Sequence, residues 1–149
     1  MECYACKSIS GEKRISPGPI IHEGKYWLVE HAYPTQLKGW LVIVTKRHVE
    51  TLHELTKQEF AELGEICERT TKILHEALNC EKEYSMCLAE VEHFQHIHFH
   101  IIPKPHDLPA ELKGSKIFAM LKVEESDAIA RHDIEQFCIN LKNRYAIDL

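Results

Sequence analysis

The clearest alternation of apolar and polar positions lies at residues 95–103, where three histidines alternate with apolar residues before a proline. Successive side chains of an extended strand point to opposite faces. We therefore expect His96, His98 and His100 to share one face of a strand, with the apolar residues on the other. Threonine, serine or lysine would suffice on the polar face of an ordinary half-buried strand. Three histidines in register therefore indicate a function.

Four other stretches have the composition of short strands. Residues 20–22 and 26–30 flank Glu23-Gly24-Lys25, which indicates a hairpin. Residues 40–44 form a continuous apolar run, which predicts a central strand covered on both faces. Residues 84–91 predict the fourth strand, before the histidine strand.

Helical spacing dominates two further segments. Residues 56–59 read Thr-Lys-Gln-Glu, a capping box, and apolar residues then recur at helical spacing up to Asn79. This pattern predicts one long amphipathic helix that covers a face of the sheet. A second stretch, from about 126 to 145, predicts a C-terminal helix, and the prolines of residues 103–116 predict a loop near the histidine face.

Length, composition and charge narrow the class of protein. With 149 residues, 44% of them hydrophobic and 28% charged, the chain has the size and composition of one globular domain, residues 1–149. The formal charge of −5 argues against nucleic acid as a partner, but it allows a small anionic ligand in a locally positive pocket. The N-terminus has neither a basic start nor an apolar run. We expect a cytoplasmic protein with no membrane partner.

Six cysteines without a secretory signal indicate free thiols or metal ligands rather than disulfides. The spacing Cys3-x-x-Cys6 lets two thiolates reach one metal ion, although two unremarkable N-terminal thiols are the alternative. His48, just after the apolar strand, is a further candidate ligand, or else a loop residue.

The histidine face itself allows three interpretations. The histidines could satisfy hydrogen bonds at a surface, or bind one metal ion as in His₃ zinc enzymes. Alternatively, a neutral imidazole could attack phosphorus while a neighbouring histidine stabilises the phosphate oxygens.

The run His96-Ile97-His98-Phe99-His100-Ile101-Ile102 resembles the His-x-His-x-His-x-x signature of the histidine triad (HIT) family of nucleotide hydrolases and transferases. The opening Cys3-x-x-Cys6, the strand leading to His48 and the long helix extend the resemblance. It implies an α+β, HIT-like fold with about five mainly antiparallel strands, one long helix packed on the sheet and a C-terminal helix. It also implies a homodimer.

The resemblance further implies a reaction at the α-phosphorus of a nucleotide. His98 would be the nucleophile and form a covalent nucleotidyl-histidine, His100 would donate to the phosphate oxygens, and His96 completes the triad. Histidine at the third position favours hydrolysis, of dinucleoside polyphosphates such as diadenosine polyphosphate or of adenylated or phosphoramidate small molecules. The ligands Cys3, Cys6, His48 and His96 would hold one structural zinc per chain.

The resemblance also nominates substrate contacts where this chain departs from the family pattern. Glu92 and His93 lie in the stretch where the family usually has a Gly-Gln pair, and Glu92 replaces the glutamine that helps to hold phosphate oxygens. Ile9 and Leu28 are candidates to contact the base, and His31 lies in the region that contacts the ribose.

Two alternatives remain open at this point. A protein of this fold could bind nucleotide as a sensor without useful turnover, which the change to Glu92 favours. Alternatively, His96, His98 and His100 could bind a catalytic metal in a His₃ metalloenzyme of cupin-like type.

Overall fold

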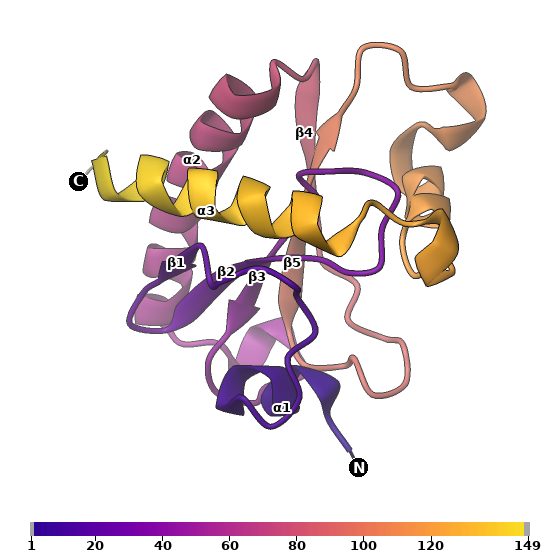
Figure 1. Ribbon diagram of the computed structural model, residues 1–149. Coiled ribbons are helices and arrows are strands. Elements are labelled where there is room, and N and C mark those ends of the chain that lie inside the picture. The colour runs from indigo at the N-terminus through magenta and orange to yellow at the C-terminus, as the bar shows by residue number, and fades with distance from the viewer. Residues whose placement is uncertain (1, 148–149) are drawn as a thin grey trace.

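The computed structural model describes residues 2–147 and is built around a five-stranded, wholly antiparallel sheet (Figure 1). The spatial order of the strands is β1-β2-β3-β5-β4. The predicted α+β fold is confirmed, and the apolar run at residues 40–44 supplies the central strand. The strands are β1 His22–Glu23, β2 Trp27–His31, β3 Leu41–Thr45, β4 Lys82–Met86 and β5 His98–Lys104.

The predicted long helix, α2 (Lys57–Leu78), begins and ends at its sequence signals. The hydroxyl of Thr56 accepts a hydrogen bond from the Glu59 amide (3.1 Å), and the Glu59 carboxylate accepts one from the Thr56 amide (2.9 Å). Asn79 takes the left-handed conformation that ends the helix. The remaining helices are α1 Tyr4–Ser10, α3 Arg131–Ile147 and the 3₁₀ turns Leu52–Glu54, Ala110–Leu112, Gly114–Met120 and Glu125–Asp127.

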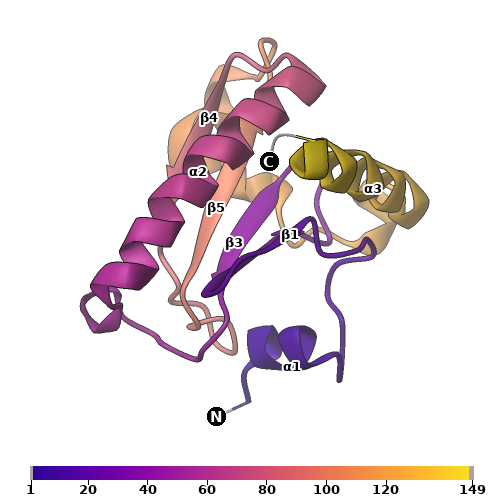
Figure 2. The same cartoon turned by 90° about the vertical axis from the view of Figure 1, so that its left-hand side faces the viewer.

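One face of the sheet is covered by α2, which runs alongside β4 and β5, and α3 packs on α2 and β2 (Figure 2). The main core lies here. Trp27 and Ile43 from the sheet are fully buried together with Leu74 of α2 and Leu141 of α3. No described helix is both long and apolar enough to cross a membrane.

The opposite face carries the histidines of β5. The β3–β5 register pairs Val42 with His100 and Val44 with His98, so these four side chains share that face. No long helix in residues 2–147 covers this face. It lies against the segments around residues 88–94 and 118–122.

Several boundaries differ from the sequence predictions. The first strand, β1, covers residues 22–23 rather than the predicted 20–22. The fourth strand ends at Met86 rather than 91, because the chain turns away with positive φ at Ala89 and His93. The C-terminal helix starts at Arg131 rather than about 126, because the preceding chain is held elsewhere: the Ile129 amide donates to the Thr35 carbonyl (2.8 Å).

The histidine strand also begins later than predicted. β5 starts at His98, and His96 lies in a bend before it. The His96 side chain is fully buried rather than displayed on the open face. His98 and His100 therefore form the histidine face, and His96 points elsewhere.

Candidate active site and metal centre

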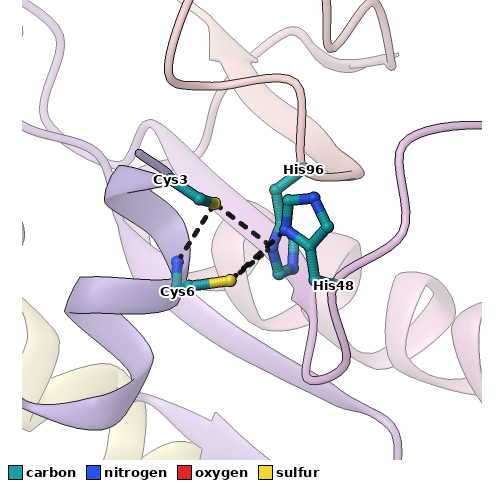
Figure 3. Close-up of side chains that lie close together, drawn as sticks. All are labelled: Cys3, Cys6, His48 and His96. Atoms are coloured by element: carbon teal, nitrogen blue, oxygen red, sulfur yellow. Dashed lines mark hydrogen bonds between the residues drawn. The ribbon is translucent and has the colours of Figure 1, made fainter. Parts of the chain in front are cut away.

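The N-terminal cysteines meet two histidines from distant parts of the chain (Figure 3). Cys3 is the N-cap of α1, and its Sγ accepts a hydrogen bond from the Cys6 amide (3.3 Å), which places both sulfurs at one end of the helix. The Sγ atoms of Cys3 and Cys6 lie 3.6 and 3.5 Å from His96 Nδ1. Cys6 Sγ also lies 3.3 Å from His48 Nδ1. All four ligand atoms lie within 4.8 Å of one another.

The outer nitrogens of both histidines have partners that orient the rings. His96 Nε2–H donates to the Thr45 carbonyl (2.6 Å), and His48 Nε2 pairs with a Glu50 carboxylate oxygen (2.8 Å). Each Nδ1 is thereby left with its lone pair toward the sulfurs. Metal-ligating histidines have outer partners of this kind. Two thiols and two oriented imidazoles suit a closed tetrahedral zinc site.

His98, at the start of β5, is fixed by a hydrogen bond to the backbone. Its Nδ1–H donates to the His96 carbonyl (2.7 Å), so Nε2 has no proton and is free to act as a nucleophile. Burial, and to a smaller extent the nearby Lys122 ammonium, lowers the pKa of the His98 imidazole. The ring is therefore neutral at neutral pH.

His100 carries its proton on the opposite nitrogen. The indole N–H of Trp40, a fully buried residue, donates to His100 Nδ1 (2.9 Å), so the proton of the neutral ring lies on Nε2. Burial, together with His98 and Lys122, lowers the pKa of His100 to about 3. The two rings are 4.9 Å apart between centroids, so a nucleophilic nitrogen and a hydrogen-bond donor stand side by side.

A cavity of about 430 Å³ opens in front of these two histidines. Its walls come from α1, β2, β3, β5 and the segments 88–94 and 118–122. Small-molecule sites in proteins span about 300–1,000 Å³ and are mostly apolar with a few placed polar groups. The lining, which includes Phe94, Phe118 and Leu121, has this character.

Three charged residues line the cavity, the acidic Glu30 and Glu90 and the basic Lys122. The carboxylate of Glu30 is buried and is paired with the guanidinium of Arg14. The Lys122 ammonium lies 3.9 Å from the centroid of the Phe94 ring, and no carboxylate within 4.0 Å pairs with it in the described part of the chain. Burial lowers the pKa of Lys122. The cavity thus holds one cation without an anionic partner.

The predicted substrate contacts are divided between the cavity and other places. His31 lines the cavity, but its Nδ1–H donates to the Ala32 carbonyl (2.7 Å) and its Nε2 accepts from the Gly39 amide (2.9 Å). Both nitrogens are therefore used within the fold. Burial lowers the pKa of His31 to about 4, so the ring stays neutral.

The other four predicted contacts do not line the cavity. The Glu92 side chain is 79% exposed and lies 3.8 Å from His93 Nε2, while the His93 ring stacks on Tyr4 with centroids 4.7 Å apart. Leu28 is buried opposite Val44. The remaining residue, Ile9, lies on α1. Their roles as substrate contacts stay predictions.

Sequence reasoning missed Trp40 and Lys122. Trp40 was assigned to a buried strand, and nothing local indicates that its N–H reaches a histidine 60 residues away. Lys122 directly follows the run Phe118-Ala119-Met120-Leu121. Its amide donates to the Pro34 carbonyl (2.8 Å), a contact that depends on the tertiary fold.

Comparison with known proteins places this geometry in a family. A family model described as "Scavenger mRNA decapping enzyme C-term binding" matches residues 2–115, more than half of the chain. A zinc-bound histidine triad family protein from Mycobacterium smegmatis has the same fold, with a TM-score of 0.67, 16% identity, and coverage of 99% of this chain and 97% of that one. The chain belongs to this family of histidine triad proteins.

Two further histidine triad relatives support the assignment. Adenosine 5′-monophosphoramidase hnt1 from Schizosaccharomyces pombe is 26% identical over 107 residues, which cover 72% of this chain and 77% of the relative. A hypothetical histidine triad nucleotide-binding protein from Sulfolobus tokodaii has a TM-score of 0.68 and 21% identity, with 95% of this chain and 93% of that one covered. The family resemblance of the His96–Ile102 run is confirmed.

Proposed function

We propose that this histidine triad protein is a nucleotidyl hydrolase that cleaves at the α-phosphorus of a nucleotide, with His98 as the nucleophile. The observation that carries the proposal is the hydrogen bond from His98 Nδ1–H to the His96 carbonyl (2.7 Å). It leaves Nε2 unprotonated on the wall of a cavity of nucleotide size. The name of the relative hnt1, an adenosine 5′-monophosphoramidase, supports this reaction class.

The reaction proceeds in two displacements. His98 Nε2 forms a bond to the α-phosphorus as the bond from phosphorus to the leaving oxygen or nitrogen breaks, and the leaving group takes up a proton from solvent. A water molecule then attacks the same phosphorus and releases a proton to solvent, the P–N bond to His98 breaks, and the nucleoside monophosphate leaves. Covalent catalysis of this kind splits one difficult displacement into two easier ones.

Two neighbours of His98 would stabilise the charge on the phosphate oxygens. His100 offers an Nε2–H whose position is set by the indole of Trp40. Because His100 is neutral, it acts as a hydrogen-bond donor rather than as a source of a proton. Lys122 offers a positive charge in the same cavity, in place of the glutamine that the family pattern would supply at Glu92. Donors placed before the reaction need no reorganisation during it.

Adenylated amines and dinucleoside polyphosphates, such as diadenosine polyphosphate, are the substrate classes that we propose. The apolar walls suit a base, and Lys122 suits phosphate oxygens. The metal centre would hold one structural zinc through Cys3, Cys6, His48 and His96. A closed Cys₂His₂ set leaves no position for substrate, so zinc held there would supply rigidity next to His98 rather than chemistry.

The His₃ metalloenzyme reading loses its support. Of the three triad histidines, only His96 clusters with other possible ligands among the described residues, and it lies with Cys3, Cys6 and His48 rather than with His98 and His100.

Turnover by matched variants tests the proposal. We expect wild-type protein to release AMP from adenosine 5′-phosphoramidate or diadenosine triphosphate, and His98→Ala to lose turnover while keeping its zinc content and unfolding temperature. His132→Ala, which changes an exposed histidine on α3, is the matched control. Full activity of His98→Ala would contradict the mechanism. Nucleotide binding without turnover in the wild type would instead favour the sensor.

A further inference from the structure

A second cluster of metal-ligating side chains lies where α2 ends and β4 begins. His75 is in the last turn of α2, Cys80 follows the helix, and Glu83 is the second residue of β4. The left-handed residue Asn79 reverses the chain, and its amide donates to the His75 carbonyl (2.7 Å). The turn therefore brings Cys80 and Glu83 back beside the helix end.

The three ligand atoms form a triangle close in size to one face of a tetrahedral metal site. Cys80 Sγ lies 3.1 Å from Glu83 Oε2 and 3.8 Å from His75 Nδ1, and His75 Nδ1 lies 3.4 Å from Glu83 Oε2. Zinc–ligand bonds of about 2.0–2.3 Å in a tetrahedron place neighbouring ligand atoms about 3.3–3.7 Å apart. The corresponding distances in the cluster around Cys6 are 3.3–3.6 Å.

Hydrogen bonding explains only part of this arrangement. The Cys80 thiol donates to Glu83, and Cys80 Sγ and His75 Nδ1 are 3.8 Å apart, which is long even for a hydrogen bond to sulfur. The 3.4 Å from His75 Nδ1 to Glu83 Oε2 exceeds the usual N–H···O length of about 2.9–3.0 Å. His75 Nδ1 thus lies near both neighbours without a short hydrogen bond to either.

Charge and exposure also suit a bound ion. A Cys80 thiolate and the Glu83 carboxylate together balance the charge of a divalent cation, and His75 is a neutral donor. The Cys80 residue is 5% exposed, whereas the His75 side chain is 50% exposed, so an ion reaches the site from solvent. A thiolate ligand favours zinc over magnesium or calcium.

We propose that His75, Cys80 and Glu83 form a second Zn²⁺ site, with water as the fourth ligand. On binding, the Cys80 thiol releases its proton to solvent, and sulfur, nitrogen and carboxylate oxygen each donate a lone pair to the ion, with no change in oxidation state. The ion ties the end of α2 to β4, the edge strand beside β5. The site is separate from Cys3, Cys6, His48 and His96, and it does not depend on the proposed hydrolase activity.

Zinc stoichiometry across a range of buffered free Zn²⁺ tests the proposal, with a non-chelating phosphine keeping the thiols reduced. We expect two zinc ions per chain in the wild type and one in Cys80→Ala and in His75→Gln. Cys67→Ser changes a thiol elsewhere on α2 and should keep both ions. Cys6→Ser should keep the second ion, and Co²⁺ bound there should show charge-transfer absorption from a single thiolate.

The variants give two independent routes to a decision. If Cys80→Ala does not fold, the zinc stoichiometry of His75→Gln tests the proposal instead, because the His75 side chain is half exposed and its replacement should disturb the fold less. A wild type that saturates at one zinc per chain would overturn the proposal. Retention of the second ion in His75→Gln with unchanged affinity would also overturn it.

Discussion

At the scale of single residues, the site depends on which ring nitrogen of each histidine carries the proton. The triad signature is local in the sequence, so the family resemblance is enough to nominate His98 as the nucleophile, a role that stays a prediction. The sequence does not predict the hydrogen bond from Trp40 that sets the proton of His100 on Nε2, because that contact spans 60 residues. Lys122 was also missed, because its place in the cavity depends on contacts with Pro34 and Phe94.

Trp40→Phe removes the N–H that fixes His100 while it keeps most of the buried aromatic surface. We expect kcat to fall about 10-fold, in the range of one hydrogen bond of about 0.5–1.5 kcal/mol, and KM to change little. Nitrogen NMR of His100 should show some of the Nδ1–H tautomer. Trp27→Phe is the control, since that indole N–H donates to the Glu59 carbonyl (2.8 Å) away from the site. Equal loss of kcat in both variants would indicate a structural effect only.

Lys122→Met should weaken use of the phosphate substrate. Hydrogen bonds to charged groups contribute about 1.5–3 kcal/mol, so kcat/KM should fall about 10- to 100-fold. Lys122→Arg should recover part of the loss, and Lys116→Met, at an exposed position outside the cavity lining, should behave as wild type. Unchanged kinetics for Lys122→Met would remove this residue from the proposed site.

His31 makes the stability of the fold depend on pH. Its pKa is about 4 in the folded state and about 6.5 when unfolded, so below pH 6.5 the unfolded chain binds the extra proton and stability falls until pH 4. Between pH 7 and 5 this contribution is about 2 kcal/mol. The free energy of unfolding, measured with urea, should depend less on pH in His31→Gln than in the wild type or in His132→Gln, which changes an exposed histidine and serves as the control. Equal pH dependence in all three would show that His31 ionises similarly in both states.

At the scale of elements, the sequence predicts those whose signals are local. The capping box at Thr56 and the left-handed Asn79 fix both ends of α2 within a few residues. The bend that turns His96 out of the histidine face has no local sequence signal, because it accompanies hydrogen bonds between distant segments. The Ile97 amide donates to the Val49 carbonyl (2.8 Å), and the Ile97 carbonyl accepts from the Thr45 amide (3.3 Å). The alternation of histidine and apolar positions therefore includes His96 and Ile97, which lie before the start of β5.

The helix α1 should depend on the metal centre. Its seven residues are too few for a stable isolated helix. Removal of zinc by a chelator, or the change Cys6→Ser, should therefore lower the amide-exchange protection of residues 4–10 while α2 and β5 stay protected. Cys67→Ser is the control. Unchanged protection of α1 after complete loss of zinc from Cys6→Ser would show that other contacts hold it.

At the scale of the whole molecule, a chain of net charge −5 places the ammonium of Lys122, which has no salt-bridge partner among residues 2–147, in a largely apolar cavity beside two neutral histidines, with Glu30 and Glu90 also in the lining. A positive charge in the cavity of a chain with negative net charge is compatible with the prediction of a small anionic ligand. Composition alone could not show where in the fold this charge lies. The homodimer and the cytoplasmic location that the sequence suggests stay predictions. The wider fold followed from the sequence because strand periodicity, helix caps and the triad signature all agree.

Detection of the covalent intermediate tests the central claim most directly. Wild-type protein is mixed briefly with adenosine 5′-phosphoramidate, quenched at neutral pH under denaturing conditions to preserve a P–N bond, and weighed intact. We predict an added AMP group that appears early, decays as substrate is consumed and maps to His98, and that is absent from His98→Ala and His98→Gly. Steady turnover with no adduct at any time, or an adduct that persists in both variants, would contradict nucleotidyl transfer through His98.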